Sequence, residues 1–436
     1  MKICQYLPWY SPAQIGGTEI YILNLSRQLI KAGIEVVILC PAGGSETERF
    51  TIDGIPVIAS AGIRTVQEHK VDLGVQEPAV PGQFEELMKE IRPDILHFHC
   101  FWRRNIFYLE QAAKLGIRTI ITPHLASFAC LQTGLLMDGK EPCDGIVEFN
   151  KCGACLIRTR TSNPILRKFS SAGSLMAHRL NIFPDISSKL GRSLDIFNEV
   201  GSMIDMCKRV DRSASSIVAI SQWYFDVLSA NEFFRKDKIR LIPTSMPKKS
   251  GVRKDRPDTK SLRIAFVGRQ SPEKGLHLLL EAVSGLPAGS VEVHLFGKSE
   301  KGRIADETDR LIREGFSIYQ HHEISNEVLL QELTSMDVLC LPSVSVEMSP
   351  LVVHEAMTAG IPVVGAARGG IRDQITDGVN GLLFRYNDAG DLLKKIDLLQ
   401  KDRSQLEDLK KNCKRPDTEI DSTSSYIELY YSLLKQ

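Results

Sequence analysis

Several features that would assign the chain to a large class of proteins are missing from its sequence. The 436 residues carry a net charge of only +1, so no overall electrostatic field favours nucleic acid as a partner. No window contains the run of about 18 apolar residues that a membrane-spanning helix requires. Pro8 and Pro12 precede any apolar stretch of the signal-peptide type. These absences predict a cytoplasmic protein that does not bind nucleic acid.

The chain also has no internal repeat, no low-complexity tract and no G-x-G-x-x-G after a strand-like run. The missing glycine motif argues against a dinucleotide-dependent oxidoreductase. Hydrophobic residues make up 43% and charged residues 25%, which is ordinary for a soluble globular protein. At about 100–200 residues per domain, this length predicts two or three domains.

Short β-branched runs alternate with amphipathic stretches in both halves of the chain. The expected strands are Ile3–Leu7, Val36–Cys40, Asp94–His99, Arg118–Thr122, Leu262–Val267, Val291–Phe296, Val338–Leu341 and Pro362–Val364. The expected helices are Gly17–Ala32, Gly275–Ser284 and Pro350–Ala359. This rhythm predicts an α/β protein with two doubly wound parallel-sheet domains facing each other across a cleft, and such sheets bind ligands at the carboxyl ends of their strands.

Two segments of the second half carry the strongest candidates for ligand binding. Gly268 and Arg269 follow a strand and Lys274 precedes a helix, so two cations are placed to neutralise a diphosphate. Ser349 and Pro350 fit the N-cap and first turn of the next helix, whose free N–H groups attract an anion.

Two glutamates flank that helix start. Glu347 lies just before it and Glu355 within the helix, where ionised carboxylates accept hydrogen bonds from sugar or ribose hydroxyls. Leu351 and the two valines after it are too apolar for an exposed helix. Gly369-Gly370 follows the next strand and adds a backbone-rich loop at the same sheet edge.

Glycine and histidine mark the corresponding edge of the first half. Gly16-Gly17 lies between the first strand and the first helix, where backbone N–H groups can bind an anion. His99 and His124 each end a strand-like run, and His97 points to the same face as His99. A lone histidine at a strand end is more often a packed or capped residue than a catalytic one, so these residues alone do not establish a catalytic role.

An ordered set of motifs in the second half resembles the retaining, nucleotide-sugar-dependent glycosyltransferases of family four, which have the GT-B fold. The shared motifs are G-R-x4-K-G at 268–275, E-x7-E at 347–355, E-A-M-x-x-G-x-P-V-V at 355–364, G-G at 369–370 and D-G-x-N-G at 377–381. One departure is Met348-Ser349-Pro350, where many members have Gly-Phe-Gly. The chain thus resembles bacterial surface-polysaccharide glycosyltransferases.

The resemblance implies a role for each matching residue. Arg269 and Lys274 would hold the diphosphate, Glu347 the transferred sugar and Glu355 the nucleotide ribose. His124 would lie near the transferred sugar, and Gly16-Gly17 near the donor phosphate. The donor would be a UDP- or GDP-sugar and the acceptor a glycan or lipid-linked glycan, with the anomeric configuration retained and no obligatory catalytic metal. A nucleotide-sugar epimerase and a non-catalytic interaction protein of the same fold are the alternatives.

These patterns also divide the chain. Residues 1–246 form the expected acceptor-side domain, 247–260 a basic linker, 261–415 the nucleotide-sugar-binding domain and 416–436 a helix that crosses back to the first domain. The first domain contains a cysteine-rich loop at 130–155 and a basic helical insert at 158–212.

Four cysteines, Cys130, Cys143, Cys152 and Cys155, fall within that loop. Their spacing suits four thiolates around a structural zinc ion, although an iron–sulfur cluster or four unligated thiols fit the same pattern. A subset of bacterial surface-polysaccharide transferases carries a similar insertion.

The insert at 158–212 holds ten Lys/Arg and five Asp/Glu. Together with its apolar face, this excess of cations suits either an anionic membrane surface or a solvated cover over the domain. We therefore expect a cytoplasmic enzyme that associates peripherally with the inner face of the cell membrane.

Overall fold

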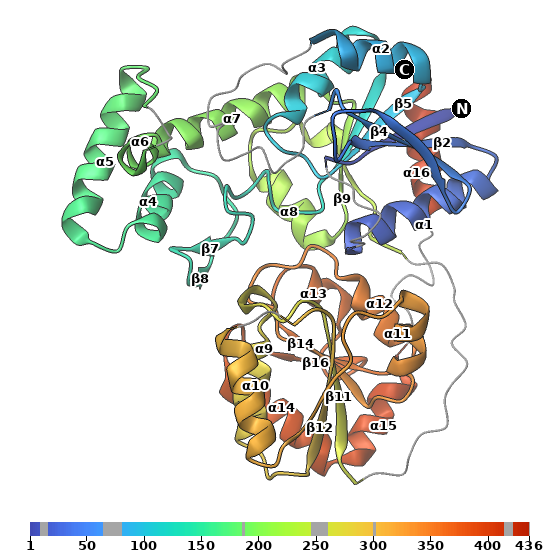
Figure 1. Cartoon of the computed structure of the whole chain (residues 1–436), viewed down its shortest axis with the longest axis vertical. Coiled ribbons are helices and arrows are strands. Elements are labelled where there is room, and N and C mark those ends of the chain that lie inside the picture. Colours follow the sequence, from blue (N-terminus) through green and yellow to red (C-terminus); the bar gives the residue numbers. More distant parts are fainter. Residues whose placement is uncertain are drawn as a thin grey trace. The chain divides into compact units, whose positions relative to one another are not determined.

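The computed structural model describes residues 1–8, 16–63, 81–184, 188–245, 260–299, 302–413 and 422–435. They form two compact units (Figure 1). Unit 1 comprises residues 1–243 and 422–436, and unit 2 comprises residues 244–421. The expected linker at 247–260 lies, except for its last residue, outside the described residues.

A sheet of eight described strands forms the centre of unit 1, in the order β10-β9-β6-β5-β1-β2-β4-β3. All neighbouring pairs are parallel except β3 with β4. The strands are β1 (Lys2–Tyr6), β2 (Glu35–Pro41), β3 (Glu48–Ile52), β4 (Ile55–Ser60), β5 (Ile95–His99), β6 (Arg118–Thr122), β9 (Ser216–Ala219) and β10 (Ile239–Leu241). Their apolar residues are nearly continuous because helices bury both faces of a parallel sheet.

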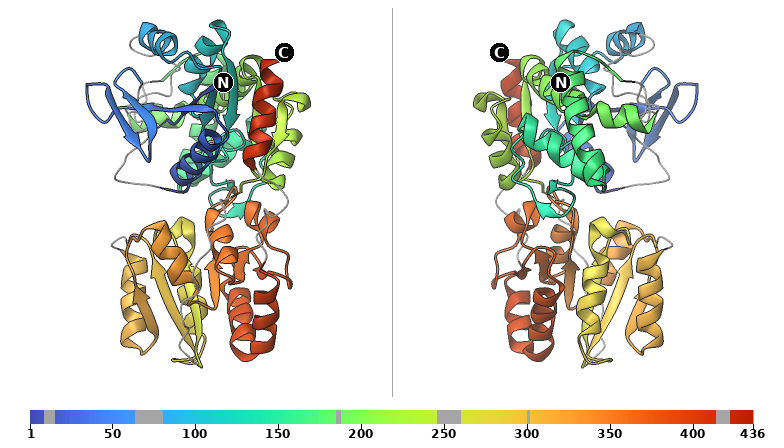
Figure 2. Two further views of the ribbon diagram at one scale, coloured as in Figure 1. Left: turned by 90° about the vertical axis from the view of Figure 1, so that its right-hand side faces the viewer. Right: turned by 90° about the vertical axis from the view of Figure 1, so that its left-hand side faces the viewer.

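Helices cover both faces of this sheet (Figures 1 and 2). On one face α1 (Gly17–Lys31) packs against α16 (Ser422–Leu434), and on the other α2 (Pro81–Ile91), α3 (Asn105–Lys114) and α7 (Ile196–Ser213) pack in series. The chain turns away from α1 at Gly33, whose φ of 79° suits glycine. The remaining elements of the main body are α8 (Gln222–Ala230) and the 3-10 helix η2 (Lys236–Lys238).

A helical subdomain extends from this body at residues 130–213. Its elements are the hairpin β7 (Leu136–Met137) and β8 (Glu141–Pro142), and the helices α4 (Phe149–Arg160), α5 (Pro164–Arg179) and α6 (Lys189–Leu194). Leu156 and Ile157 of α4 pack on Ile196 and Val200 of α7, so the segment expected to be a helical insert is helical and has an apolar core of its own. A bidentate ion pair between Arg160 and Glu199, at 2.6 and 2.8 Å, joins the same two helices.

Unit 2 is built on a wholly parallel sheet of six described strands in the order β13-β12-β11-β14-β15-β16. The strands are β11 (Leu262–Val267), β12 (Val291–Phe296), β13 (Ser317–Gln320), β14 (Val338–Leu341), β15 (Val363–Ala366) and β16 (Gly381–Phe384). The helices are η3 (Pro272–Lys274), α9 (Leu276–Ser284), α10 (Arg303–Arg313), α11 (Asn326–Leu333), α12 (Leu351–Thr358), α13 (Gly369–Gln374), α14 (Ala389–Lys401) and α15 (Arg403–Lys411). Figure 1 shows α9, α10 and α14 on one side of the strands and α11 and α12 on the other.

The expected architecture of two Rossmann-like parallel sheets is confirmed. The C-terminal helix α16 belongs to unit 1, where the Tyr426 hydroxyl lies 3.0 Å from that of Tyr21 on α1. One hairpin was not expected from the sequence: β3 and β4 are joined by Asp53-Gly54, both with positive φ. None of the described helices has the length and apolar character needed to cross a bilayer.

Candidate functional site

The carboxyl edge of the unit 2 sheet gathers the segments that carry the motifs. Gly268 and Arg269 follow β11, the loop of residues 342–349 follows β14, and Gly369-Gly370 follows β15. Because these strands are neighbours and run in parallel, their carboxyl ends open onto one edge. We call these three segments, together with η3, the edge site.

An ion pair lies at the centre of the edge site. Lys274 Nζ donates to Glu347 Oε1 at 2.8 Å, and the Ser343 hydroxyl donates to the same oxygen, also at 2.8 Å. The side chains of Lys274 and Glu347 retain 31% and 17% of their exposure, so both remain accessible to a ligand. The structure thus places two of the predicted catalytic residues in direct contact.

Backbone contacts fix the two loops that carry this pair. The Glu273 carbonyl accepts hydrogen bonds from the N–H groups of Val344 and Ser345, at 2.9 and 3.0 Å. Gly275 has a φ of 73°, and a Cβ there would lie 1.9 Å from the Pro342 carbonyl oxygen. Only glycine therefore lets η3 pack this closely against the end of β14.

Arg269, the second predicted cation, is exposed and makes no hydrogen bond or ion pair within the described part of the chain. It acts electrostatically on Glu273, whose carboxyl pKa lies below its ordinary value mainly because the Ser271 hydroxyl and the N–H of Glu273 itself lie near it, with Arg269 adding to the effect. Arg269 therefore keeps its hydrogen-bond donors available to a ligand at the edge site.

The start of α12 differs from the sequence prediction by one residue. Pro350, with φ of −68° and ψ of 120°, is the N-cap, and no side chain caps the helix. Ser349 was expected in that role, but its hydroxyl accepts a hydrogen bond from Gln374 Nε2 at 3.1 Å. Leu351 is thus the first helical residue, and Gly360, directly after the expected helix end at Ala359, takes a left-handed conformation with a φ of 73°.

Glu355 and the glycine pair Gly369-Gly370 make contacts that fix the elements around the edge site. Glu355 is buried on α12 and accepts a hydrogen bond from Asn326 at the start of α11. The Gly370 N–H donates to the Glu347 carbonyl at 2.8 Å, and a Cβ on Gly370 would lie 1.9 Å from the Met348 carbonyl oxygen. Gly370 therefore holds the loop of Glu347 in place, and this N–H is not free to bind an anion.

In unit 1, the predicted glycine pair lies at the start of α1. Gly16 is the residue before the helix and Gly17 is its first residue, and both are exposed. The Gly16 N–H already donates to Glu19 Oε2 at 3.0 Å. This carboxylate occupies the favourable position at the helix N-terminus, so the Gly16 N–H is not available to a phosphate in this conformation.

His97, His99 and His124 of unit 1 lie close together in two hydrogen-bonded groups. His99 Nδ1 lies 3.1 Å from His124 Nε2, and His99 Nε2 lies 2.6 Å from Gln5 Oε1. His97 lies between Tyr430 of α16, at 2.8 Å, and Thr122, at 2.7 Å. The rings of His97 and His99 are 4.0 Å apart, as expected for residues two apart on one face of a strand.

Burial keeps these histidines uncharged. It lowers the pKa of His124 to about 3 and the pKa values of His97 and His99 well below their usual value, and the neighbouring imidazoles lower those two further. At neutral pH, His124 is therefore a neutral hydrogen-bonding group and not a cation. It can orient a sugar hydroxyl but cannot neutralise a diphosphate.

The four cysteines of the 130–155 loop are half-buried free thiols. Burial raises the pKa values of Cys130, Cys152 and Cys155. The Asp138 N–H donates to the Cys155 sulfur at 3.1 Å. Among the described residues, no group of three or more His, Cys, Asp or Glu side chains is arranged to hold a metal ion.

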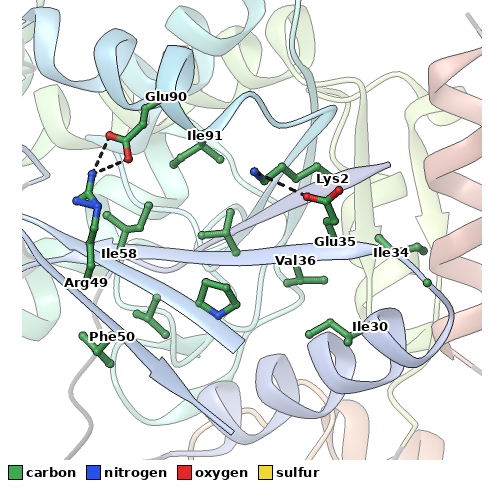
Figure 3. A pocket seen from close by; sticks show the side chains of 14 residues that line it. Lys2, Ile30, Ile34, Glu35, Val36, Arg49, Phe50, Ile58, Glu90 and Ile91 are labelled. Atoms are coloured by element: carbon green, nitrogen blue, oxygen red, sulfur yellow. Dashed lines mark hydrogen bonds and ion pairs between the residues drawn. The ribbon is translucent and has the colours of Figure 1, made fainter. Parts of the chain in front are cut away.

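A hollow of about 580 Å³ in unit 1 is lined by none of the predicted site residues. Figure 3 shows the ion pairs Arg49–Glu90 and Lys2–Glu35 beside it, with the apolar side chains of Val36, Ile58 and Ile91 among the residues that line it. Lys2 and Glu35 begin their strands, so the hollow lies at the amino edge of the sheet. Ligands of doubly wound sheets bind at the opposite edge.

Two family models match the chain. Residues 248–415 match the glycosyl transferases group 1, and residues 16–147 match a glycosyl transferase 4-like domain. A D-inositol 3-phosphate glycosyltransferase of Mycobacterium sp. (strain KMS) is 35% identical over 146 residues, which is 33% of each chain. Sulfoquinovosyl transferase SQD2 of Arabidopsis thaliana is 34% identical over 147 residues, 33% of this chain and 28% of that one. The matched segment thus spans about a third of the length of these curated relatives.

Solved structures share the whole architecture. Sucrose-phosphate synthase from Thermosynechococcus elongatus superposes with a TM-score of 0.69 at 16% identity, and Anabaena HepE in complex with UDP with a TM-score of 0.65 at 15% identity. Each superposition covers 100% of both chains. At this level of identity the likeness establishes the fold alone, while the two family models identify the domains. Residues 248–415 therefore form a glycosyl transferases group 1 domain and residues 16–147 a glycosyl transferase 4-like domain, in a chain with the GT-B architecture.

Proposed function

We propose that the protein transfers a sugar from a nucleotide diphosphate sugar to a glycan or lipid-linked glycan, with retention of the anomeric configuration. The contact of Lys274 and Ser343 with Glu347 at the carboxyl edge of the unit 2 sheet is the observation that carries this proposal. A cation and a carboxylate side by side suit a ligand that joins an anionic diphosphate to a hydroxyl-rich sugar. The similar HepE was solved with UDP-glucose, a donor of this class.

Each residue of the edge site would have a separate task in this reaction. Negative charge builds up on the departing diphosphate, and Arg269, Lys274 and the N–H groups at the start of α12 would stabilise it. Glu347 would accept a hydrogen bond from a sugar hydroxyl, and Glu355 from the nucleotide ribose. His124, being neutral, would orient a sugar hydroxyl. None of these tasks requires a metal ion or a covalent sugar–enzyme intermediate.

A panel of UDP-, GDP- and ADP-sugars tests the donor class directly. One donor is expected to raise the melting temperature and to be turned over, since a ligand that binds only the folded state stabilises it. The anomeric configuration of the product, followed by proton NMR, distinguishes retention from inversion. Release of an epimerised sugar without an acceptor would replace the transferase by an epimerase, and absence of binding by every donor would contradict the proposal.

We also propose that the 130–155 loop binds one structural zinc ion through its four cysteines. The support is that the hairpin between Cys130 and Cys143 lies against the Cys-x2-Cys pair of α4, where the Asp138 N–H donates to the Cys155 sulfur at 3.1 Å. The sulfurs would have to move together on binding, because the described arrangement does not itself hold an ion. Elemental analysis is expected to find about one zinc per chain and to find it lost in Cys152→Ser; protein without stoichiometric metal would overturn this proposal.

If the acceptor is lipid-linked, the enzyme works at the inner surface of the cell membrane. The excess of cations in residues 158–212 supports this position, and the face that would make the contact can be identified separately.

A further inference from the structure

Helix α5 exposes its large apolar side chains and buries its small side chains, which is the reverse of an ordinary surface helix. Its buried positions are the small residues Ser170, Ser174 and Ala177. Its large apolar side chains point outward: Ile165, Phe169 and Met176 are 66%, 72% and 57% exposed. A helix that packs on its own domain normally buries its largest apolar residues and exposes the polar ones.

The exposed apolar residues are concentrated here and nowhere else in the described chain. Nine large hydrophobic side chains are at least half exposed, and eight of them lie between residues 165 and 190. Those eight are Ile165, Leu166, Phe169, Met176, Leu180, Ile182, Phe183 and Leu190. Isolated exposed apolar residues are normal on a protein surface, whereas a cluster of this kind marks a contact surface.

The helix that carries these residues is well formed, so the exposure is not a consequence of fraying. At its start the Asn163 side chain accepts hydrogen bonds from the N–H groups of Ile165 and Leu166, and Pro164 occupies the first turn. At its end Asn181 has a φ of 52° and the Ile182 N–H donates to the Ala177 carbonyl at 2.8 Å, which is a Schellman motif.

Contacts with α7 anchor the same helix to unit 1. The Phe197 N–H donates to the Ser174 hydroxyl at 2.9 Å, and Asn198 Nδ2 donates to the Ile182 carbonyl at 2.9 Å. The backbone at both points is therefore fixed while Ile182 and Phe183 remain 50% and 73% exposed. Figure 1 shows α5 at the outer end of unit 1, and the right-hand view of Figure 2 shows this green helical region from its own side.

Spacing along the helix places four of the apolar residues in one row. Ile165, Phe169, Met176 and Leu180 lie four, seven and four positions apart, which puts them on one face of an α-helix. We call this row the apolar stripe. Lys168 and Arg179 border it, each three positions after a stripe residue, and neither forms an ion pair within the described residues.

The positive charge around the apolar stripe indicates which kind of partner it would bind. Residues 164–194 contain five Lys/Arg and a single acidic residue, Asp185. A second copy of the chain would bring an equally cationic surface against the first, and like charges oppose that contact. A layer of anionic lipid headgroups over apolar acyl chains complements both the cations and the stripe.

We propose that the apolar stripe of α5, with Ile182 and Phe183 beyond its end, inserts into the interfacial layer of an anionic membrane. This proposal rests on the proposed function at a membrane surface and adds which face of unit 1 makes the contact. The helix lies in the plane of the bilayer, its stripe buried among the acyl chains and Lys168 and Arg179 among the headgroup phosphates. Unit 1 is thereby held where a lipid-linked acceptor lies.

Flotation of the full-length chain with vesicles tests this inference. Vesicles of phosphatidylcholine with about one-third phosphatidylglycerol are expected to recover the wild-type protein, and pure phosphatidylcholine vesicles to recover much less. Phe169→Gln/Met176→Gln is expected to lower the partition coefficient by at least about tenfold, because two large apolar groups no longer leave water. Lys168→Glu/Arg179→Glu is expected to lower it by a similar factor and to remove its dependence on salt.

Matched controls separate this effect from general changes of hydropathy and charge. Ile312→Gln/Val379→Gln makes the apolar-to-amide change at two other exposed positions, and Lys31→Glu/Lys114→Glu reverses two exposed charges of unit 1. Both controls should float like the wild type. The inference would be overturned if neutral vesicles recovered the protein equally well, or if neither kind of vesicle recovered it. It would also be overturned if the stripe variants floated like the wild type, or if their only effect were to dissociate a dimer of the chain.

Turnover of the nucleotide sugar, measured without vesicles, distinguishes failure of this inference from failure of the proposed function. Phe169→Gln/Met176→Gln is expected to keep its turnover in solution while losing flotation. Lys274→Ala should show the reverse pattern, with flotation kept and turnover lost.

Discussion

Replacement of Lys274 by alanine is expected to lower kcat for sugar transfer by about 10²- to 10³-fold, with both units still folded. The loss has two sources. The departing diphosphate loses the cation at the end of η3, and Glu347 loses the ammonium group that lies 2.8 Å from its Oε1 and keeps only the Ser343 hydroxyl. Glu347→Gln should cost less, because an amide oxygen still accepts both hydrogen bonds but carries no charge.

Lys401→Ala provides the matched control for this measurement. Lys401 lies in the same unit and pairs with Asp397 at 2.7 Å, but on an exposed face of α14 away from the edge site. The variant removes an ion pair of similar length, so kcat should be unchanged. Exposed pairs contribute at most about 1 kcal/mol, so thermal unfolding should show Lys401→Ala close to the wild type, and the same measurement checks that Lys274→Ala and Glu347→Gln remain folded. Wild-type turnover in both Lys274→Ala and Glu347→Gln would refute the assignment of the edge site.

The parts of the fold that were predictable from sequence are those whose cause is local. The strands β11, β12 and β14 end where expected, because a strand buried on both faces is a continuous apolar run bounded by polar or turn residues. Gly33 and Gly360 directly follow the expected helix ends at Ala32 and Ala359, and each takes a left-handed conformation that glycine adopts without strain. The carboxyl-edge rule then placed Lys274 and Glu347 together from sequence alone.

Other features depended on partners that no local pattern reveals. His97 is held by Tyr430, which is 333 positions away on α16, and Glu355 by Asn326 on another helix. The hydroxyl of Ser349 looked like a helix cap but is used by Gln374. Two signals were available and not used: Asp53-Gly54 is a typical hairpin turn, and Ser343 is a polar residue directly after a buried strand at the binding edge.

Acidification is expected to lower the stability of unit 1 strongly. In the unfolded chain His97, His99 and His124 titrate near pH 6.5, whereas burial lowers their folded pKa values, that of His124 to about 3. Below about pH 6.5 the unfolded state therefore binds more protons than the folded state. The stability that these groups contribute is fully present above that pH and is lost as the pH falls, at up to about 1.4 kcal/mol per pH unit for each histidine.

The contribution of one histidine can be isolated by substitution. His124→Gln keeps an N–H donor for His99 Nδ1 but does not titrate, so the slope of unfolding free energy against pH should fall by about 1.4 kcal/mol per pH unit between about pH 4 and 6. Urea titrations followed by tryptophan fluorescence report on the correct unit, because all three tryptophans lie in unit 1. The control is His322→Asn, an exposed histidine of unit 2 whose φ of 54° asparagine tolerates, and its slope should equal that of the wild type. A wild-type slope in His124→Gln would mean that His124 is protonated in the folded state at mildly acidic pH. It could then act as a cation beside the sugar, contrary to the neutral role derived from its burial.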